Sequence, residues 1–188
     1  MAFLQIDYKS EALMRGVNIK VILPSDGMAG KWEPPYKTLY LLPGYSATAT
    51  ELITYLGLRG QSELKGIAIV LPDGENLFYQ DLPDRMTFYS TYVGKELVEV
   101  TRKMLPLSTK REDTFIGGIS MGGYGALYNG FKYRDTFSKV VAFSPAADAC
   151  MLLAGSEAPG FSRAQFEGIF GNREAYYGSE CDMCTQWT

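Results

Sequence analysis

Ser120 is the candidate nucleophile of the chain. The run Gly118-Ile119-Ser120-Met121-Gly122 places a glycine two positions before Ser120 and another two positions after it. This G-x-S-x-G spacing is typical of a nucleophile elbow, a sharp strand-to-helix turn whose small neighbours let the backbone pass closely. Because a buried-strand pattern precedes Ser120 and a helical pattern follows it, the context favours a nucleophile at Ser120.

A glycine-rich turn has two other interpretations. It can pack tightly without doing chemistry, or it can bind a phosphate group at the helix N-terminus. A dinucleotide fingerprint would need a third glycine at Tyr128, and a P-loop would need a lysine at Tyr124. Both phosphate motifs fail, so a turn that only packs tightly remains the alternative.

Hydrophobic patterning around Ser120 predicts an α/β fold. Alternating apolar residues at 3–9 and 17–23 predict an antiparallel hairpin. Short apolar runs predict buried strands at 38–42, 66–71, 114–118 and 139–143, and apolar residues at helical spacing predict helices at 51–64, 87–105, 121–131 and 161–170. Strands that alternate with helices predict a mostly parallel central sheet with helices on both faces.

Length and charge limit the range of functions. The 188 residues predict a single domain, 1–188, in which 171–188 form an irregular tail without clear periodicity. A net charge of −3, from 18 basic and 21 acidic residues, gives little reason to expect nucleic-acid binding. The longest uncharged run, 114–131, is rich in glycine, so we expect no membrane-spanning helix.

The chain contains no histidine, which removes the commonest catalytic base and the commonest metal ligand. Cys181 and Cys184 have the spacing of a redox pair or of half a zinc site, but their aperiodic tail offers no fourth ligand. We therefore expect no metal and no cofactor. Together with Cys150 the chain has three cysteines, which cannot all pair within it, so we expect a reducing, cytoplasmic location.

The segment from Phe115 to Ala126 resembles the esterase D-like branch of the α/β-hydrolases, which includes S-formylglutathione hydrolases and tributyrin, acetyl and feruloyl esterases. Leu39 to Gly44, Lys110 to Glu112 and Ala142 to Pro145 support the resemblance, which covers about residues 1–170. It implies a serine carboxylesterase of α/β-hydrolase fold that acts on short acyl or aryl esters, including esters of carbohydrates, through an acyl-enzyme on Ser120.

The resemblance also implies an oxyanion hole made by the backbone N–H groups of Met121 and Tyr45. This chain has Pro43-Gly44 where the family usually has His-Gly, and the change affects the loop conformation rather than the donor. The family's triad continues with an acid and a histidine after two further strands, which this chain lacks. The resemblance therefore implies a C-terminally truncated esterase without its last strands.

Several other residues are weaker candidates for the site. Asp148 follows the strand predicted at 139–143 and is a possible triad acid, although a capping or loop role is favoured. Asp73 ends the strand predicted at 66–71, and we expect an ordinary turn aspartate there. Tyr79 and Tyr89 fall on the segment expected to overhang Ser120, so they are candidates either for a substrate pocket or for the core.

Two functions from different classes follow from these residues. The first is ester hydrolysis at Ser120. The alternative is a truncated or degenerate α/β-hydrolase domain that binds a ligand or partner without turnover, because the usual base is missing. In either case, the strand at 139–143 is expected to form a sheet edge covered by the tail or by another copy, which predicts self-association.

Overall fold

A computed structural model describes residues 1–26, 32–151 and 161–185. Its centre is a six-stranded sheet with the order β1-β2-β4-β3-β7-β8. The bounds of these strands are β1 Ala2–Ser10, β2 Arg15–Leu23, β3 Lys37–Leu42, β4 Ile67–Pro72, β7 Thr114–Ile119 and β8 Lys139–Phe143. β1 and β2 form an antiparallel hairpin, β2 pairs antiparallel with β4, and β4, β3, β7 and β8 are parallel. The predicted hairpin and parallel sheet are confirmed.

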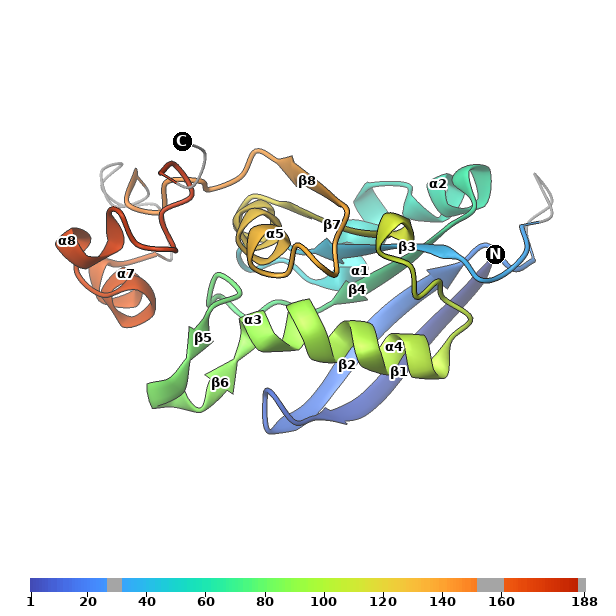
Figure 1. Cartoon of the computed structure of the whole chain (residues 1–188), viewed down its shortest axis with the longest axis horizontal. Helices are drawn as coiled ribbons and strands as arrows, with labels where there is room; N and C mark the ends of the chain where they lie inside the picture. Colours follow the sequence, from blue (N-terminus) through green and yellow to red (C-terminus); the bar gives the residue numbers. More distant parts are fainter. Residues whose placement is uncertain (27–31, 152–160, 186–188) are drawn as a thin grey trace.

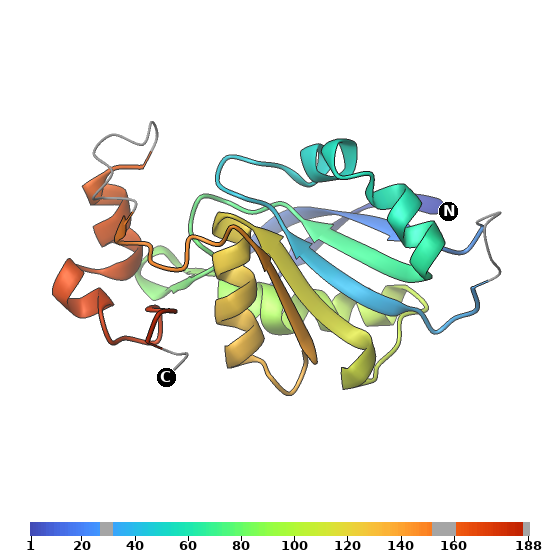
Figure 2. The same ribbon diagram turned by 90° about the horizontal axis from the view of Figure 1, so that it is seen from above.

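Helices lie on both faces of this sheet (Figures 1 and 2). On one face are α3 Tyr89–Thr91, a π-helical turn Tyr92–Glu96, α4 Leu97–Met104 and α5 Met121–Lys132. On the other face are α1 Ala49–Tyr55 and α2 Leu58–Lys65. The larger core contains Tyr40, Val70 and Ile116 on the α4 and α5 face, whereas Leu41 and Ile69 belong to a smaller core under α1 and α2.

Some element boundaries differ from the sequence-based prediction. The single helix predicted at 51–64 is two helices, because Gly57 has a left-handed conformation with φ of +59° between α1 and α2. The helix predicted from residue 87 begins at Tyr89, since β6 Thr87–Phe88 pairs with β5 Asp81–Leu82. Such two-stranded pairing has no clear sequence signal when each strand has only two residues.

The helix predicted at 161–170 is present, and the tail predicted to be irregular from residue 171 contains a further short helix. α7 spans Arg163–Phe170, and α8, which was not predicted, spans Arg173–Tyr176. The Tyr176 ring is fully buried and packs edge-on against Phe166 and Phe170. These aromatic contacts, rather than a periodic pattern in the sequence, fix the segment.

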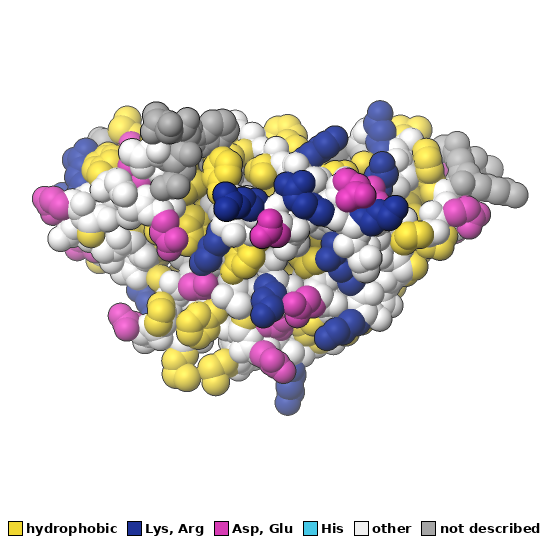
Figure 3. Space-filling model, in the orientation of Figure 1, with side chains coloured by type: hydrophobic (Ala, Val, Ile, Leu, Met, Phe, Trp, Pro, Cys, Tyr) yellow, Lys and Arg dark blue, Asp and Glu magenta, His cyan; other side chains and the backbone are white. Residues whose placement is uncertain are grey.

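The surface of the described chain mixes charges. Figure 3 shows acidic and basic side chains interspersed over the face of the molecule that it presents. No helix among residues 1–26, 32–151 and 161–185 is both long enough and apolar enough to cross a bilayer.

Candidate active site

Ser120 lies on the tight turn between β7 and α5, at the carboxyl end of the parallel strands. Its backbone has φ of +55° and ψ of −117°, a conformation that is strained for any residue other than glycine. The residue is exposed. The Ser120 N–H donates to the Phe143 carbonyl oxygen at 2.9 Å, and its carbonyl oxygen accepts from Ala146 N–H at 3.2 Å. These two hydrogen bonds attach the turn to the end of β8, and the sharp strand-to-helix turn predicted at Ser120 is present.

The glycines beside Ser120 are required by close backbone contacts. A methyl group on Gly122 would overlap the carbonyl oxygens of Leu42 and Pro43, at the end of β3. A methyl group on Gly118 would overlap the carbonyl oxygen of Gly122. Larger residues would push the strand, the helix and the β3 loop apart, so the glycines bring the β3 loop against the serine.

Both residues expected to supply the oxyanion hole border this turn. Met121 is the first residue of α5, where backbone N–H groups have no acceptor within the helix. Tyr45 follows Gly44, and a methyl group on Gly44 would lie 3.5 Å from the Ser120 Cβ. The structure therefore brings the loop of Tyr45 and the helix start at Met121 to the same serine.

The C-terminal segment reaches this loop through two residues that the sequence analysis did not select. The Phe161 ring packs edge-on against the Tyr45 ring, with 5.7 Å between the ring centres. The Gln165 side-chain amide donates a hydrogen bond of 3.2 Å to the Tyr45 hydroxyl. The sequence signal was the capping box of Ser162 and Gln165, which marks the start of α7. A capping box locates a helix but does not predict which loop the helix contacts.

Tyr79 is a core residue rather than a pocket residue. Its side chain is fully buried, and its hydroxyl donates to the Pro43 carbonyl oxygen at 2.7 Å. Burial raises the pKa of this hydroxyl well above its usual range. The pocket interpretation of Tyr79 is therefore wrong, because the ring fills the space above Gly125 and Gly74.

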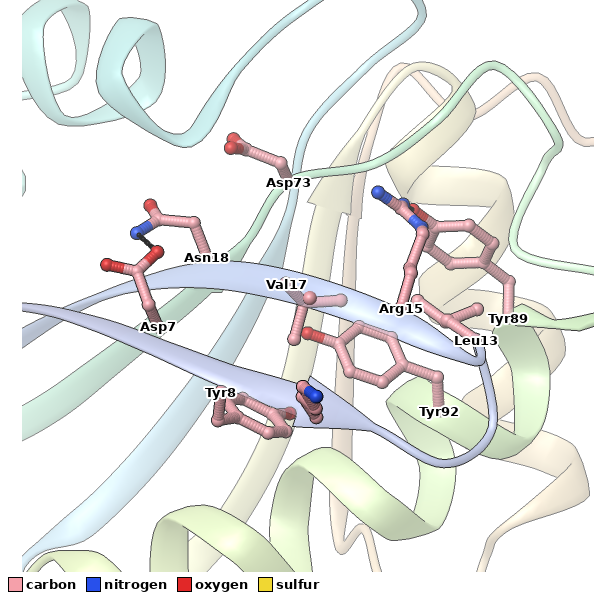
Figure 4. A pocket seen from close by; sticks show the side chains of 11 residues that line it. Asp7, Tyr8, Leu13, Arg15, Val17, Asn18, Asp73, Tyr89 and Tyr92 are labelled. Atoms are coloured by element: carbon pink, nitrogen blue, oxygen red, sulfur yellow. Dashed lines mark hydrogen bonds between the residues drawn. The ribbon is translucent and has the colours of Figure 1, made fainter.

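Tyr89 lines a cavity, but one whose lining does not include Ser120 (Figure 4). The cavity, of about 540 Å³, lies over the β1–β2 hairpin and also borders Asp73. The Tyr89 hydroxyl accepts a hydrogen bond from Arg15 at 3.0 Å, and only 2% of the residue is exposed. This contact holds Tyr89 against the hairpin, so the structure does not place it in a pocket at Ser120.

The carboxylates of the two candidate aspartates accept hydrogen bonds from backbone N–H groups. Asp148 accepts from Cys150 N–H at 2.9 Å and from the Tyr177 hydroxyl at 3.3 Å. Asp73 accepts from Ala49 N–H at 2.8 Å, at the start of α1. Asp148 therefore has the capping or loop role favoured for it, whereas Asp73 contacts the start of α1, 24 residues away in the chain, rather than only its own turn.

Cys150, Cys181 and Cys184 are free thiols. Burial raises the pKa of the Cys181 thiol, whose Sγ lies 3.4 Å from the Gln80 side-chain oxygen, so it is protonated at neutral pH. Within residues 1–26, 32–151 and 161–185, no group of histidine, cysteine or acidic side chains is arranged to hold a metal ion.

A mostly parallel sheet with helices on both faces and a strained serine turn between strand and helix define an α/β-hydrolase. The Esterase family matches residues 10–181, and the chain belongs to this family. An acetyl esterase of Caldicellulosiruptor saccharolyticus is 40% identical over 151 residues, which cover 78% of this chain and 57% of the relative. An S-formylglutathione hydrolase of Paracoccus denitrificans is 28% identical over 192 residues, covering 89% of this chain and 63% of the relative.

A solved structure of a serine hydrolase is also similar to this chain. FphF, a fluorophosphonate-binding serine hydrolase of Staphylococcus aureus, is similar with a TM-score of 0.82 and 28% identity. That comparison covers 97% of this chain and 71% of FphF. The chain thus spans less than two thirds of the length of the curated acetyl esterase and S-formylglutathione hydrolase that it matches.

Proposed function

We propose that the chain is a serine carboxylesterase that acts on short-chain acyl or aryl esters through an acyl-enzyme on Ser120. The observation that carries the proposal is the strained, exposed turn of Ser120 at the carboxyl edge of the sheet. Backbone strain of this kind persists only where the surrounding structure enforces it, and it is concentrated at functional sites. Family membership and the relatives that are named esterases support the same activity.

In the proposed reaction, the Ser120 oxygen attacks the ester carbonyl carbon, and the carbonyl oxygen becomes an oxyanion. The N–H groups of Met121 and Tyr45 stabilise this charge. The intermediate then expels the alcohol, which takes the serine proton, and leaves the acyl group on Ser120. Attack by water releases the acid and restores the hydroxyl.

The chain's lack of histidine bears on the rate of this reaction. General acid–base catalysis typically contributes about 10²- to 10⁴-fold. Triad enzymes that lose a member retain roughly 10³- to 10⁴-fold over water from the oxyanion hole and binding. We therefore expect slow acylation of Ser120 by activated esters and still slower deacylation.

The test is hydrolysis of p-nitrophenyl acetate by the wild-type chain and by Ser120→Ala, with mass spectrometry of the protein after mixing. We expect release of p-nitrophenol and an acetyl adduct on the Ser120 peptide, both absent from the variant. Equal rates for the two proteins would overturn the proposal and favour a domain that binds ligand or partner without turnover. Ser120-dependent turnover at ordinary esterase rates would instead reveal an unrecognised base, and Asp148 and Asp73 would be the first to mutate.

The part of the site proposed to contact the acyl group of the substrate is apolar and aromatic. Tyr45 belongs to the loop that contacts Ser120, and its half-buried ring packs against the half-buried ring of Phe161. These two rings are suited to contact an acetyl or aryl group. An ester of ferulic acid with a sugar would present such an aryl group, with the carbohydrate in solvent. Comparing p-nitrophenyl acetate with p-nitrophenyl ferulate, which release the same alcohol, tests whether this site prefers an acetyl or an aryl acyl group.

We also propose that two copies associate through β8. No described strand pairs with its outer edge, and 43% of Val141 and 58% of Phe143 are exposed there. Figures 1 and 2 show α7 and α8 to one side of the sheet rather than along the outer edge of β8. An antiparallel pairing centred on Val141 would place Lys139 opposite the partner's Phe143 and avoid opposed like charges.

Light scattering at high protein concentration tests this association. We expect dimers, and we expect Val141→Lys to dissociate them because two ammonium groups would face each other. A monomer under the same conditions would overturn the β8 pairing.

The proposed location is the cytoplasm, where a reducing environment keeps thiols free. The free Cys150, Cys181 and Cys184 support it. Cell fractionation with an antibody against the chain tests it, and recovery from the culture medium would contradict it.

A further inference from the structure

Two loops lie side by side at the carboxyl edge of the sheet. The first loop, residues 43–49, follows β3 and holds Tyr45, and the second loop, residues 73–79, follows β4. Because β3 and β4 are parallel neighbours, both loops leave the sheet at the same edge as Ser120. In three places a side chain of the second loop bonds a backbone group of the first, at intervals of three residues in both loops: Tyr79 to Pro43, Asn76 to Ser46 and Asp73 to Ala49.

Asn76 makes the middle contact of this series. Its side-chain oxygen accepts a hydrogen bond of 2.7 Å from Ser46 N–H, and its side-chain N–H₂ donates to the Ser46 hydroxyl oxygen at 3.4 Å. An ion pair between Glu75 and Arg15 also attaches the second loop to β2. The second loop is therefore anchored on both sides of Asn76, and these anchors hold Asn76 opposite Ser46.

Ser46 is a strained position in the first loop. Ala47 N–H donates to the Gly44 carbonyl oxygen at 3.2 Å, which closes a β-turn with Tyr45 and Ser46 at its centre. Ser46 has φ of +58°, a conformation for which turns ordinarily use glycine. A serine keeps this conformation only where neighbouring groups enforce it. The hydrogen bond from Ser46 N–H to Asn76 therefore stabilises the turn in this form.

The same turn carries one of the two proposed oxyanion donors, Tyr45 N–H. The turn lies close to the nucleophile, since a methyl group on Gly44 would be 3.5 Å from the Ser120 Cβ. An oxyanion donor acts at about 2.7–3.1 Å from the charged oxygen, so a small displacement of the turn weakens it. Without the bond to Asn76, Ser46 would relax toward a negative φ, and this relaxation would displace the turn.

We propose that Asn76 is a positioning residue for the oxyanion hole. It acts through Ser46 rather than on the ester: its side-chain oxygen holds Ser46 N–H, and Ser46 holds the turn that presents Tyr45 N–H. This inference rests on the proposed ester hydrolysis at Ser120. Asn76 and Ser46 are both exposed, so water can replace either partner, and the bond affects the reaction more than the stability of the fold.

The test follows p-nitrophenol release during acylation of Ser120 by p-nitrophenyl acetate, at a series of ester concentrations. A donor that acts in the transition state changes the rate constant and leaves ester binding unchanged. In Asn76→Ala we therefore expect the rate constant at saturating ester to fall about tenfold, with an unchanged half-saturating concentration. Asn18→Ala is the matched control, because Asn18 also makes a side-chain hydrogen bond, to Asp7 on the hairpin, and its loss should leave the rate unchanged.

A second substitution identifies the cause of the loss. Ser46→Gly removes the strain, because glycine adopts a φ of +58° without a Cβ clash. In this background Asn76→Ala should lower the rate constant less than about twofold. Equal rates for wild type and Asn76→Ala would overturn the proposal, and so would a tenfold loss that persists in the Ser46→Gly background.

Two further comparisons separate this inference from the proposed function. Amide NMR should show a shifted Tyr45 signal in Asn76→Ala, and an unchanged Tyr45 signal would overturn the positioning role even if the rate falls. Equal p-nitrophenol release by wild type and Ser120→Ala would overturn the proposed function, and the inference with it. Release that depends on Ser120 but not on Asn76 would overturn this inference alone.

Discussion

The Tyr79 hydroxyl donates a hydrogen bond of 2.7 Å to the carbonyl oxygen of Pro43, 36 residues earlier in the chain. Tyr79 is fully buried, and Pro43 precedes the glycine that lies against Ser120. The bond therefore ties the loop after β3, which holds Tyr45, to the core of the molecule.

Replacing Tyr79 with phenylalanine should lower the free energy of unfolding by about 1–3 kcal/mol, because the Pro43 carbonyl oxygen would lose its partner without access to water. Urea denaturation followed by circular dichroism measures the change. Tyr55→Phe is the matched control, since 78% of Tyr55 is exposed and its loss of a hydroxyl should be neutral. Equal stability of Tyr79→Phe and wild type would contradict a structural role for the bond.

Gly122→Ala should destabilise the chain by at least about 3 kcal/mol or prevent folding, because the new methyl group overlaps backbone oxygens of Leu42 and Pro43. Gly60→Ala in the exposed interior of α2 meets no atom within 4 Å. It should raise stability by up to about 1 kcal/mol. Thermal unfolding of the two variants beside wild type shows whether their effects have these opposite signs.

The backbone strain at Ser120 predicts a gain in stability when glycine replaces the serine. Ser120→Gly should raise the free energy of unfolding by about 1 kcal/mol, because glycine adopts a φ of +55° without a Cβ clash. Ser120→Ala retains the Cβ and should show no such gain. Chemical denaturation distinguishes the two variants, and a stabilised Ser120→Ala would argue against backbone strain as the cause.

Glu96 anchors the tip of the β1–β2 hairpin. Its carboxylate accepts hydrogen bonds from the Ser10 hydroxyl at 3.1 Å, from Glu11 N–H at 3.1 Å and from Ala12 N–H at 2.7 Å. Glu96→Ala should therefore cost about 2 kcal/mol and speed hydrogen exchange at the hairpin turn. Glu99→Ala, an exposed position on the same helical stretch, is the control. Unchanged exchange at the turn would rule out this anchoring.

Buried tyrosines make the fold sensitive to alkali. Burial raises the pKa of Tyr40 from 10.0 to about 12, and its hydroxyl lies 2.8 Å from that of Thr101. Because the unfolded chain ionises at lower pH, this contribution to stability is complete below pH 10 and is lost as pH rises to about 12. We expect tyrosine ionisation, followed by ultraviolet absorbance, to coincide with unfolding. Tyr40→Phe should shift this alkaline unfolding to higher pH, and an unshifted transition would contradict the assignment.

Much of the fold could be predicted because its signals are local. The alternation in β1 and β2 predicted a hairpin, and the apolar runs of β3 and β7 predicted buried parallel strands. The glycines around Ser120 predicted the tight turn, since only a close backbone approach requires them. In each case, neighbouring residues in the chain carry the information.

Local sequence patterns predicted the strands of the central sheet, its main helices and the turn at Ser120, but the side chains that surround this turn depend on the tertiary structure. Tyr79 and Tyr89 were equivalent in the sequence, yet one fills the core above Gly125 and the other binds Arg15 over the hairpin. Gln165 reaches Tyr45 across 120 residues. A side chain's burial and partners depend on which distant elements cover it, and no local pattern encodes that.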